Sequence, residues 1–456
     1  MPTLSLSRTL SLAALALLGN LSACTGERVT TAPLPDDADT IDSDAPPRDG
    51  AWTAASEGEA TAEPEPAATG PTYAADVRPI LTRACITCHR QGGMAPFAFD
   101  TYAKAKQVSA LIADATRART MPPTGIDNSG DCNTFRDTTY LTDAEIDTLG
   151  AWAQQGAPEG NAATPAPSIP NVPTLSGDVR TVKTPPYTPS TARADDYRCF
   201  VIDSPFAEST NVTGFDTKPG SMQAHHMVVF YPMDDLTATL AVMKDALEPG
   251  PGYTCFGTPG IPATVIAAWT PGSGATLYPD ESGIGVVPKR PLIVQMHYNT
   301  AHGMGLGPDS TRIDFSVKKE GITPIAFVNL IDLEMNLQPG LKEVDEVFTR
   351  TLGGMRPNLT KPVQIVGVYP HMHELGYRQV LTIAGAGQTQ EACMVDVPNY
   401  QFNWQRMYMF DKPVTVQPTD LLKLTCKYDT TPRTAVTKWG EGTQDEMCVM
   451  GLLVKQ

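Results

Sequence analysis

The sequence predicts a multidomain fold in which an α-helical domain precedes two antiparallel β-sandwich domains. Its 456 residues are enough for about three domains of ordinary size. Helical patterns occupy the segment between two proline-rich stretches, whereas short β-rich runs separated by Gly and Pro turns fill the rest. The net charge of -16, without a basic stripe, argues against nucleic-acid binding.

Residues 1–23 form the first segment, which we interpret as an export signal. They contain one charged residue, Arg8, and an apolar run, Leu10 to Leu18, that is too short to span a bilayer. The ending Leu-Ser-Ala-Cys resembles the bacterial lipobox, which implies lipidation of Cys24. An ordinary signal that ends beside a cysteine is the alternative. The resemblance implies a lipid anchor in a bacterial cell envelope. Thr25, not Asp, follows the cysteine, which by resemblance to lipoprotein sorting patterns favours the outer membrane, facing the periplasm or the cell surface.

Two further segments are expected to lack a fold of their own. Residues 24–72 hold eleven acidic residues, two arginines and seven prolines, and too little apolar surface to fold, so they predict a disordered acidic tether. Residues 161–190 again contain seven prolines and predict a linker. The two segments enclose a domain at residues 73–160.

The enclosed domain contains a Cys-x-x-Cys-His motif in helical surroundings. An Ala-rich stretch, Phe99 to Arg119, and a capping box at Thr142 predict two helices. Cys85 and Cys88 can form thioethers to a haem while His89 ligates its iron. A zinc knuckle is the competing interpretation, but no second Cys/His pair lies nearby to complete four ligands.

The second axial ligand of such a haem is expected to be Met121. This methionine lies in a proline-stiffened loop between the two helices. Met94 is the competitor, but it is so near His89 in the sequence that it would reach the opposite haem face with difficulty, and it can equally be a core residue. The whole segment resembles a class I cytochrome c domain, which implies one covalently bound haem c.

Residues 191–456 contain short runs rich in Val, Ile, Thr and aromatic residues. They predict two sandwiches, residues 191–320 and 321–456. Five of the seven histidines fall in these runs. His371 and His373 share one face of a strand and can hold one metal ion. His225 and His226 are adjacent, so they need a strand end, a bulge or different ring nitrogens to do so, and His297 taken alone would be an ordinary core histidine.

This β-rich half resembles the copper type II (ascorbate-dependent) monooxygenases, the family of peptidylglycine alpha-hydroxylating monooxygenase and dopamine beta-monooxygenase. The matching pieces occur in family order: Gln223–Met227, Ala268–Trp269, Val294–Tyr298, His371–Gly376 and Asp445–Cys448. The resemblance implies jelly-roll sandwiches and two copper ions. One copper is implied on His225, His226 and His297, and the other, catalytic, copper on His371, His373 and Met447. A thioether ligand favours Cu(I), which suits a site of O2 reduction.

The resemblance implies hydroxylation of an sp3 C–H bond of a small organic substrate with O2. Tyr369 stands where the peptide-amidating branch has an Arg for the substrate carboxylate, so we do not expect peptidylglycine as substrate. Electrons are expected to pass through the fused haem from an external donor, either a small reductant or a periplasmic redox protein. Two alternatives stay open: a non-enzymatic haem and copper electron carrier or sensor, and a zinc hydrolase.

The nine cysteines are compatible with an oxidising compartment. Without Cys24 and the haem pair, six remain. The family resemblance implies a disulfide between Cys426 and Cys448. The other four allow three pairings, of which we favour Cys199 with Cys255. These four are Cys132, Cys199, Cys255 and Cys393.

Overall fold

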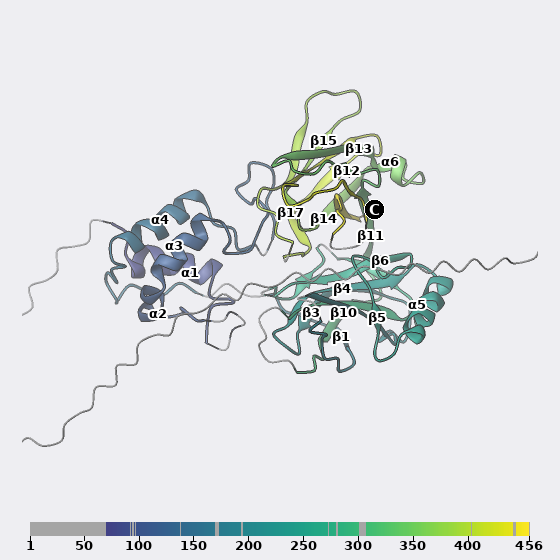
Figure 1. The fold of residues 1–456 in the computed structure, drawn as a ribbon, viewed down its shortest axis with the longest axis horizontal. Coiled ribbons are helices and arrows are strands. Elements are labelled where there is room, and N and C mark those ends of the chain that lie inside the picture. The colour runs from purple at the N-terminus through teal and green to yellow at the C-terminus, as the bar shows by residue number, and fades with distance from the viewer. Residues whose placement is uncertain are drawn as a thin grey trace, which may run out of the picture. The chain divides into compact units, whose positions relative to one another are not determined.

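The computed structural model describes residues 70–455, except 92, 94, 96, 137, 169–172, 193–194, 272, 280, 301–306, 403 and 441–443. The predicted signal, Cys24, nearly all of the predicted tether and Met94 therefore lie outside the described residues. Strands dominate the described chain and helices are few, as expected for β-sandwich domains (Figure 1). No helix among these residues is both long enough and apolar enough to cross a membrane.

Short helices form the N-terminal part of the described chain. A π-helical turn, Tyr73–Val77, leads into α1 (Arg78–Ala84), which is followed by α2 (Tyr102–Gln107), α3 (Ser109–Arg117) and α4 (Asp143–Gln154). Thr142 and Glu145 form the predicted capping box at the start of α4. The apolar faces of the helices share one core that includes Leu81, Leu149 and Trp152. The stretch predicted as one helix is divided at Val108, a β-branched residue with a non-helical backbone.

The first sandwich packs a five-stranded sheet against part of a nine-stranded sheet. The five-stranded sheet has the order β5-β2-β9-β4-β6. Its strands are β2 (Asp195–Ile202), β4 (Ala224–Pro232), β5 (Tyr253–Thr254), β6 (Ala263–Trp269) and β9 (Leu292–Asn299). Facing it are β1 (Asp178–Lys183), β3 (Thr210–Lys218), β7 (Thr276–Leu277), β8 (Ser282–Val286) and β10 (Arg312–Lys318). Helix α5 (Asp235–Leu247) follows β4.

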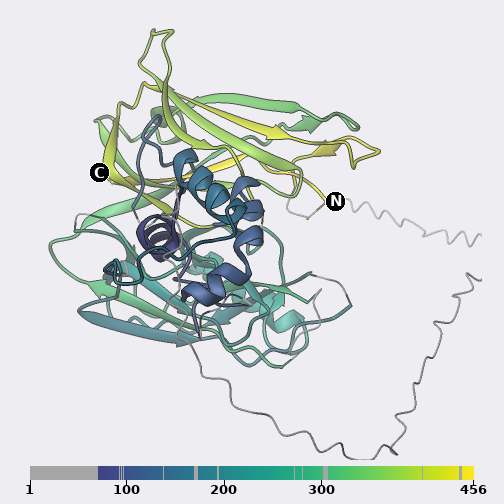
Figure 2. The ribbon, with the colours of Figure 1, turned by 90° about the vertical axis from the view of Figure 1, so that its left-hand side faces the viewer.

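The second sandwich uses the rest of the nine-stranded sheet. This part contains β11 (Thr323–Ile331), β14 (Val363–His371), β17 (Tyr408–Val416) and β20 (Val449–Lys455). Its partner sheet contains β13 (Val344–Thr351), β15 (Gly376–Ala384), β16 (Ala392–Val397) and β18 (Leu421–Tyr428). A small pair, β12 (Asn336–Leu337) with β19 (Thr437–Lys438), and the short helix α6 (Leu352–Met355) complete it. Figure 2 shows the strands of the two sandwiches as separate groups, teal and green to yellow.

The two sandwiches are joined by hydrogen bonds and by apolar packing. Strand β11 pairs in parallel with β8, which makes the nine-stranded sheet continuous between them. Several residues of the second sandwich pack into the core of the first, among them Tyr369 and Met407. The hydroxyl of Tyr278 in the first sandwich lies 3.9 Å from the sulfur of Met407. An apolar interface of this kind restricts relative motion of the two halves.

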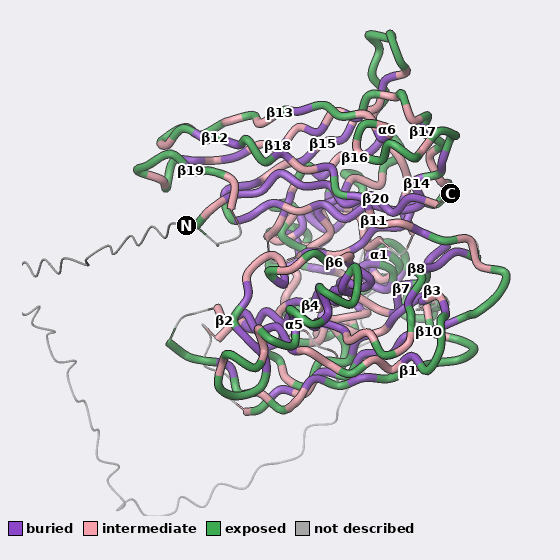
Figure 3. The backbone as a smooth tube through the Cα atoms, turned by 90° about the vertical axis from the view of Figure 1, so that its right-hand side faces the viewer, coloured by how far each residue is buried: buried purple, intermediate pink, exposed green. Residues whose placement is uncertain are grey.

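Burial along the strands shows which faces are covered. Strand β18 alternates between buried and less buried positions, as expected when one face meets the core (Figure 3). Strands β4 and β9 are buried at nearly every position, because their outer face is covered as well. The outer face of β4 includes Val228 and Phe230, which line the cleft described below.

Two segments differ from the predicted boundaries. The predicted linker, residues 161–190, contains β1, which is the edge strand of the nine-stranded sheet and pairs with β10, so the first sandwich begins near Asp178. The prolines on both sides of this short and mostly exposed strand conceal its pattern in the sequence. In addition, residues 120–140, here called the docking arm, leave the helical core. Ile126 and Phe135 of the arm belong to the core of the second sandwich, and Cys132 forms a disulfide with Cys393.

Candidate metal centres

Three histidines from two neighbouring strands come together on the first sandwich. His225 and His226 lie at the start of β4, and His297 on β9 is the direct cross-strand partner of His226. Ligand atoms of the three rings all lie within 4.8 Å of one another. The pairing of β4 with β9 is irregular between Ala224 and His226. A bulge of this kind lets two adjacent side chains turn to the same region, which a regular strand would prevent.

Hydrogen bonds and packing orient the rings of this three-histidine set. The Nε2 atom of His297 lies 2.9 Å from Oδ1 of Asp195, and its Nδ1 atom lies 3.1 Å from Nδ1 of His226. Tyr197 stacks on the His297 ring with 4.1 Å between ring centroids. The buried Nδ1 of His225 has no hydrogen-bond partner among the described residues. The Nδ1 atoms are thus the nitrogens that fit a bound ion.

Two imidazoles of the set, those of His225 and His226, are kept neutral by their environment. Burial, with the neighbouring His297 as a smaller cause, lowers the pKa of His225 to about 4 and the pKa of His226 well below its ordinary value. Neutral imidazole is the form that binds a metal ion. The donor set therefore fits copper and also fits zinc.

The other predicted ligands lie at neighbouring strand ends of the second sandwich. His371 ends β14, and His373 follows two residues later, beyond the strand. Met447 is buried and precedes β20, which pairs with β14 beside it. The rings of His371 and His373 are nearly perpendicular, with 5.3 Å between their centroids. Two nitrogens and a thioether at one place form a donor set suited to Cu(I).

The Nδ1 atoms of both rings in this His-Met set are engaged with protein oxygens. His371 donates from Nδ1 to Oε1 of Gln405 at 2.8 Å, and His373 donates from Nδ1 to the carbonyl of Asp445 at 3.1 Å. An ion would therefore be held through Nε2 of each ring. Burial lowers the pKa of His371 to about 3, so this ring is neutral too. Such outer hydrogen bonds fix the orientation of metal-binding histidines.

Glu446 connects the two segments that carry the His-Met set. Its carboxylate is completely buried and accepts the backbone N–H groups of His373 at 2.9 Å, Leu375 at 2.7 Å and Met447 at 3.1 Å. Burial raises the pKa of this carboxyl to about 7. One side chain thus holds the turn after β14 against the segment before β20.

A cleft lies between the two donor sets. His226 and Gln295 line it from the first sandwich, and His371, His373 and Met447 line it from the second. His226 and His371 are close enough that His371 contributes to the lowered pKa of His226. A small molecule in this cleft would lie beside the His-Met set and near the three-histidine set.

The residues expected to hold haem lie after α1. Cys85 and Cys88 form no disulfide, and both side chains are partly exposed. His89 donates from Nδ1 to the carbonyl of Phe97 at 3.0 Å and stacks on Phe99, so Nε2 is the ring nitrogen that this hydrogen bond leaves available. Met121 is 45% exposed and lines a small pocket with Asn399 of the second sandwich. Among the described residues that line this pocket, none belongs to the Cys-x-x-Cys-His motif.

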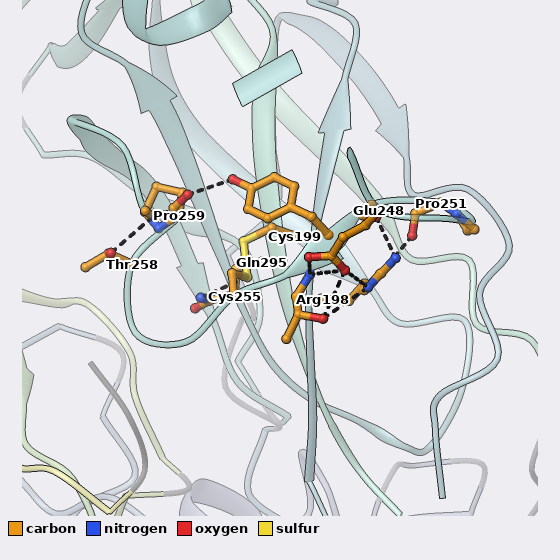
Figure 4. The surroundings of a disulfide bond; sticks show 12 residues. Arg198, Cys199, Glu248, Pro251, Cys255, Thr258, Pro259 and Gln295 are labelled. Atoms are coloured by element: carbon orange, nitrogen blue, oxygen red, sulfur yellow. Dashed lines mark hydrogen bonds and ion pairs between the residues drawn. A yellow bond between two sulfur atoms is a disulfide. The ribbon is translucent and has the colours of Figure 1, made fainter. Parts of the chain in front are cut away.

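The described residues form three disulfides. Cys199 on β2 is joined to Cys255, close to Gln295 and to the ion pair of Arg198 with Glu248 (Figure 4). The Cys426–Cys448 bridge links β18 to the residue directly after Met447. Both pairs are those that the sequence analysis named, and Cys132–Cys393 is the third.

The sequence did not predict a role for three residues at these centres, namely Asp195, Gln405 and Glu446. Asp195 is 102 residues from its partner His297, and Gln405 is 34 residues from His371, so neither contact leaves a local pattern. Glu446 lies within the Asp445–Cys448 motif that carries the family resemblance. The available signal for the role of Glu446 was its position directly before Met447 in the sequence.

Comparison with known proteins gives one family match in the β-rich half and several similar proteins. A family model described as "Copper type II ascorbate-dependent monooxygenase, C-terminal domain" matches residues 324–453, which include the His-Met set. The chain is similar to tyramine beta-hydroxylase of Caenorhabditis briggsae, with 26% identity over 268 residues, 56% of this chain and 44% of that protein. It is also similar to dopamine beta-hydroxylase of Canis lupus familiaris, with 30% identity over 197 residues, 41% of this chain and 31% of that protein.

The chain spans less than half the length of these relatives. The dopamine beta-hydroxylase of Homo sapiens gives the same result, with 26% identity over 303 residues, 62% of this chain and 47% of that protein. Among solved structures, empty cowpea mosaic virus particles match 64% of this chain and 93% of theirs at 9% identity, but the TM-score of 0.22 supports no conclusion.

Proposed function

The chain belongs, through residues 324–453, to the copper type II ascorbate-dependent monooxygenase family, and from this premise we propose that it hydroxylates an sp3 C–H bond of a small organic substrate with O2. The cleft with a donor set on each side is the observation that carries the proposal. In this reaction one oxygen atom enters the C–H bond and the other leaves as water. Two electrons and two protons must come from outside the substrate.

The two donor sets divide the chemistry. His225, His226 and His297 would hold one copper, and His371, His373 and Met447 would hold the other. Copper supplies one-electron redox chemistry and, where a soft thioether ligand is present, reaction with O2. Gln405, Asp195 and Glu446 keep the ligands in place, while the apolar walls of the cleft exclude water from the reacting carbon.

A fused electron donor completes the proposal. Residues 73–160 would hold a covalent haem c through Cys85 and Cys88, with His89 and Met121 as axial ligands. The hydrogen bond of His89 Nδ1 to Phe97 and the unpaired state of both thiols support this assignment. An external reductant would visit this haem twice in each turnover, because one haem carries one electron. The haem would pass its electron first to the copper held by the three-histidine set.

The proposed place of action follows from the lipobox resemblance. Cys24 would carry the lipid and hold the enzyme in a bacterial cell envelope, facing the periplasm or the cell surface. Labelling with a fatty-acid analogue tests this assignment. Unlabelled mature protein, or label retained in a Cys24→Ser variant, would overturn it.

A substrate screen of copper-loaded protein tests the main proposal. O2 consumption and product mass are followed together for the parent, for Met447→Ile and for Met335→Ile, a matched control at a buried methionine outside the cleft. We expect product with an added mass of one oxygen atom in the parent and the control, and none in Met447→Ile. Equal turnover in Met447→Ile, or turnover with zinc in place of copper, would contradict the proposal.

Stopped-flow mixing tests the electron path. Protein with reduced haem and oxidised copper is expected to lose its reduced-haem spectrum faster than it turns over. A His297→Ala variant should block this step. Haem that stays reduced much longer than a turnover in the copper-loaded parent would mean that the haem serves another partner.

A further inference from the structure

The cleft between the two donor sets has an uncharged lining. Among the described residues that line it, none is Asp, Glu, Lys or Arg. Apart from the histidines, most of the wall is aromatic or aliphatic. The larger apolar members are Phe230, Phe256, Phe327, Ile331, Phe402 and Trp439.

The two glutamines of the wall are engaged in hydrogen bonds within the protein. Oε1 of Gln405 accepts from His371 at 2.8 Å and from the hydroxyl of Tyr369 at 3.3 Å, and its amide donates to the carbonyl of Phe402 at 2.8 Å. The amide of Gln295 donates to the sulfur of Cys255 at 3.4 Å. These side chains offer dipoles to the cleft but no compensating charge.

Two acidic side chains near the cleft, those of Asp195 and Glu446, are engaged elsewhere. Asp195 bonds to His297 at 2.9 Å and to the amide of Asn299 at 3.4 Å. Glu446 is completely buried behind the ligands, and both of its oxygens accept backbone N–H groups. Neither acid lines the cleft. Among the described lining residues, an ammonium group in the cleft would thus gain no carboxylate for its lost hydration, and a carboxylate would find no guanidinium or ammonium.

Resting on the proposed function, we propose that the substrate of this cleft is an uncharged molecule that is mainly hydrocarbon, with an aromatic or alkyl body and at most a hydroxyl or carbonyl group. Burying an unpaired ionised group costs several kcal/mol even after relaxation. Aromatic and aliphatic walls instead stabilise a neutral ring or chain through apolar burial and ring contacts. The reacting C–H bond would belong to this hydrocarbon body.

Three probes of similar size and different charge test the proposal. We use 2-phenylethanol (neutral), 2-phenylethylamine (cationic at pH 7) and 3-phenylpropanoate (anionic), and measure binding to copper-loaded protein by equilibrium dialysis and turnover by product mass. We expect the neutral probe to bind at least about 100-fold more tightly than either ion, because about 2.7 kcal/mol of unpaid desolvation corresponds to that ratio. An ion that binds as tightly as the alcohol, or an alcohol that does not bind, would overturn the proposal.

A charge placed in the cleft tests where the probe lies. Asn329 lines the cleft with an exposed side chain, whereas Asn358 is an exposed asparagine outside it. Asn329→Asp should tighten binding of 2-phenylethylamine at least about tenfold, with little change for 2-phenylethanol, and Asn358→Asp should change neither. Equal responses of the two variants would contradict binding in this cleft.

Failure of the substrate class can be told apart from failure of the proposed function. Copper-loaded protein with a reductant and no substrate should still reduce O2 and release hydrogen peroxide, and Met447→Ile should not. If that reaction is present while an ionic probe is preferred, the proposed class is wrong and the monooxygenase proposal stands. If the reaction is absent, the monooxygenase proposal itself is contradicted.

Discussion

Asp195 accepts the Nε2–H of His297 at 2.9 Å, so that Nδ1 of His297 is the ring nitrogen facing Nδ1 of His226. This bond stabilises the ionised carboxylate and is the main reason that the pKa of Asp195 is lowered. It also selects one tautomer and one orientation for His297. The acid begins β2, and His297 lies on the neighbouring strand β9, so the sheet itself fixes the pair.

The first prediction is that Asp195→Ala weakens copper binding at the three-histidine set by about 10- to 100-fold, as is usual when the outer partner of a metal-binding histidine is lost. Asp195→Asn should weaken it less, because an amide oxygen can still accept the Nε2–H. Competition with a chelator measures the affinity. Asp178→Asn, on the exposed edge strand β1, is the control. Unchanged affinity in Asp195→Ala would show that the strand pairing alone orients His297.

The second prediction concerns the carboxylate that holds the His-Met set together. Glu446→Gln keeps the size of the side chain but turns one acceptor into a donor that faces backbone N–H groups, so the free energy of unfolding should fall by about 2 kcal/mol. The His-Met set should also lose affinity for Cu(I), while the three-histidine set keeps its copper. Urea unfolding of the metal-free protein and Cu(I) competition measure the two effects.

The control for this variant is Glu374→Gln, an exposed glutamate three residues after His371. It should alter neither quantity. If Glu446→Gln reduces stability but leaves Cu(I) affinity unchanged, the carboxylate supports the fold without positioning the ligands.

The third prediction is a pH dependence of stability caused by Glu346 on β13. Burial and a hydrogen bond with Asp332 raise the pKa of Glu346 to about 7. Between its unfolded pKa near 4.5 and about 7, the folded state holds one more proton than the unfolded state. The free energy of unfolding should therefore decrease as pH rises through this window, by about 1–2 kcal/mol after allowance for the partial exposure of the group.

Glu346→Gln is neutral at every pH and should remove this decrease. Urea unfolding at pH 5, 6, 7 and 8 measures it, and Glu343→Gln, at an exposed position on the same segment, should retain it. If the stabilities of the parent and of Glu346→Gln change in parallel from pH 5 to pH 7, Glu346 does not bind the extra proton in the folded state and the prediction is wrong.

The fourth prediction concerns the docking arm. Replacing Cys132 and Cys393 together by Ser removes a link between residues 261 positions apart, and chain entropy sets its contribution at up to about 5 kcal/mol. We expect limited proteolysis to cut the arm in this variant and not in the parent. A double Ser variant at Cys199 and Cys255 should leave the arm protected. An arm that stays uncut would mean that burial of Ile126 and Phe135 holds it without the disulfide.

Local patterns in the sequence predicted much of the fold, whereas contacts between residues far apart in the sequence could not be predicted. Thr142 and Glu145 are three residues apart, so their capping box could be predicted, and short runs rich in Val, Ile, Thr and aromatic residues predicted the strands. The histidines of the two donor sets were predicted together because the family motifs that carry them are local. In contrast, the bond between Asp195 and His297, the bulge at His225 and the packing of Phe135 in the second sandwich depend on which strands become neighbours. A single sequence contains no signal that shows which strands become neighbours.

The last prediction concerns the division of copper between two sites. Met447→Ile removes the soft donor but leaves β4 and β9 untouched, so the protein should keep one copper and lose the sulfur ligand signal in X-ray absorption spectra. His297→Ala removes the central ring of the other set, where it contacts both His226 and Asp195. It should keep the copper with the sulfur ligand. Because the two sets lie on different sandwiches and share only the cleft, combining the variants should remove both metals additively. If both single variants lose the same copper, or if either loses both, the division into two sites is wrong.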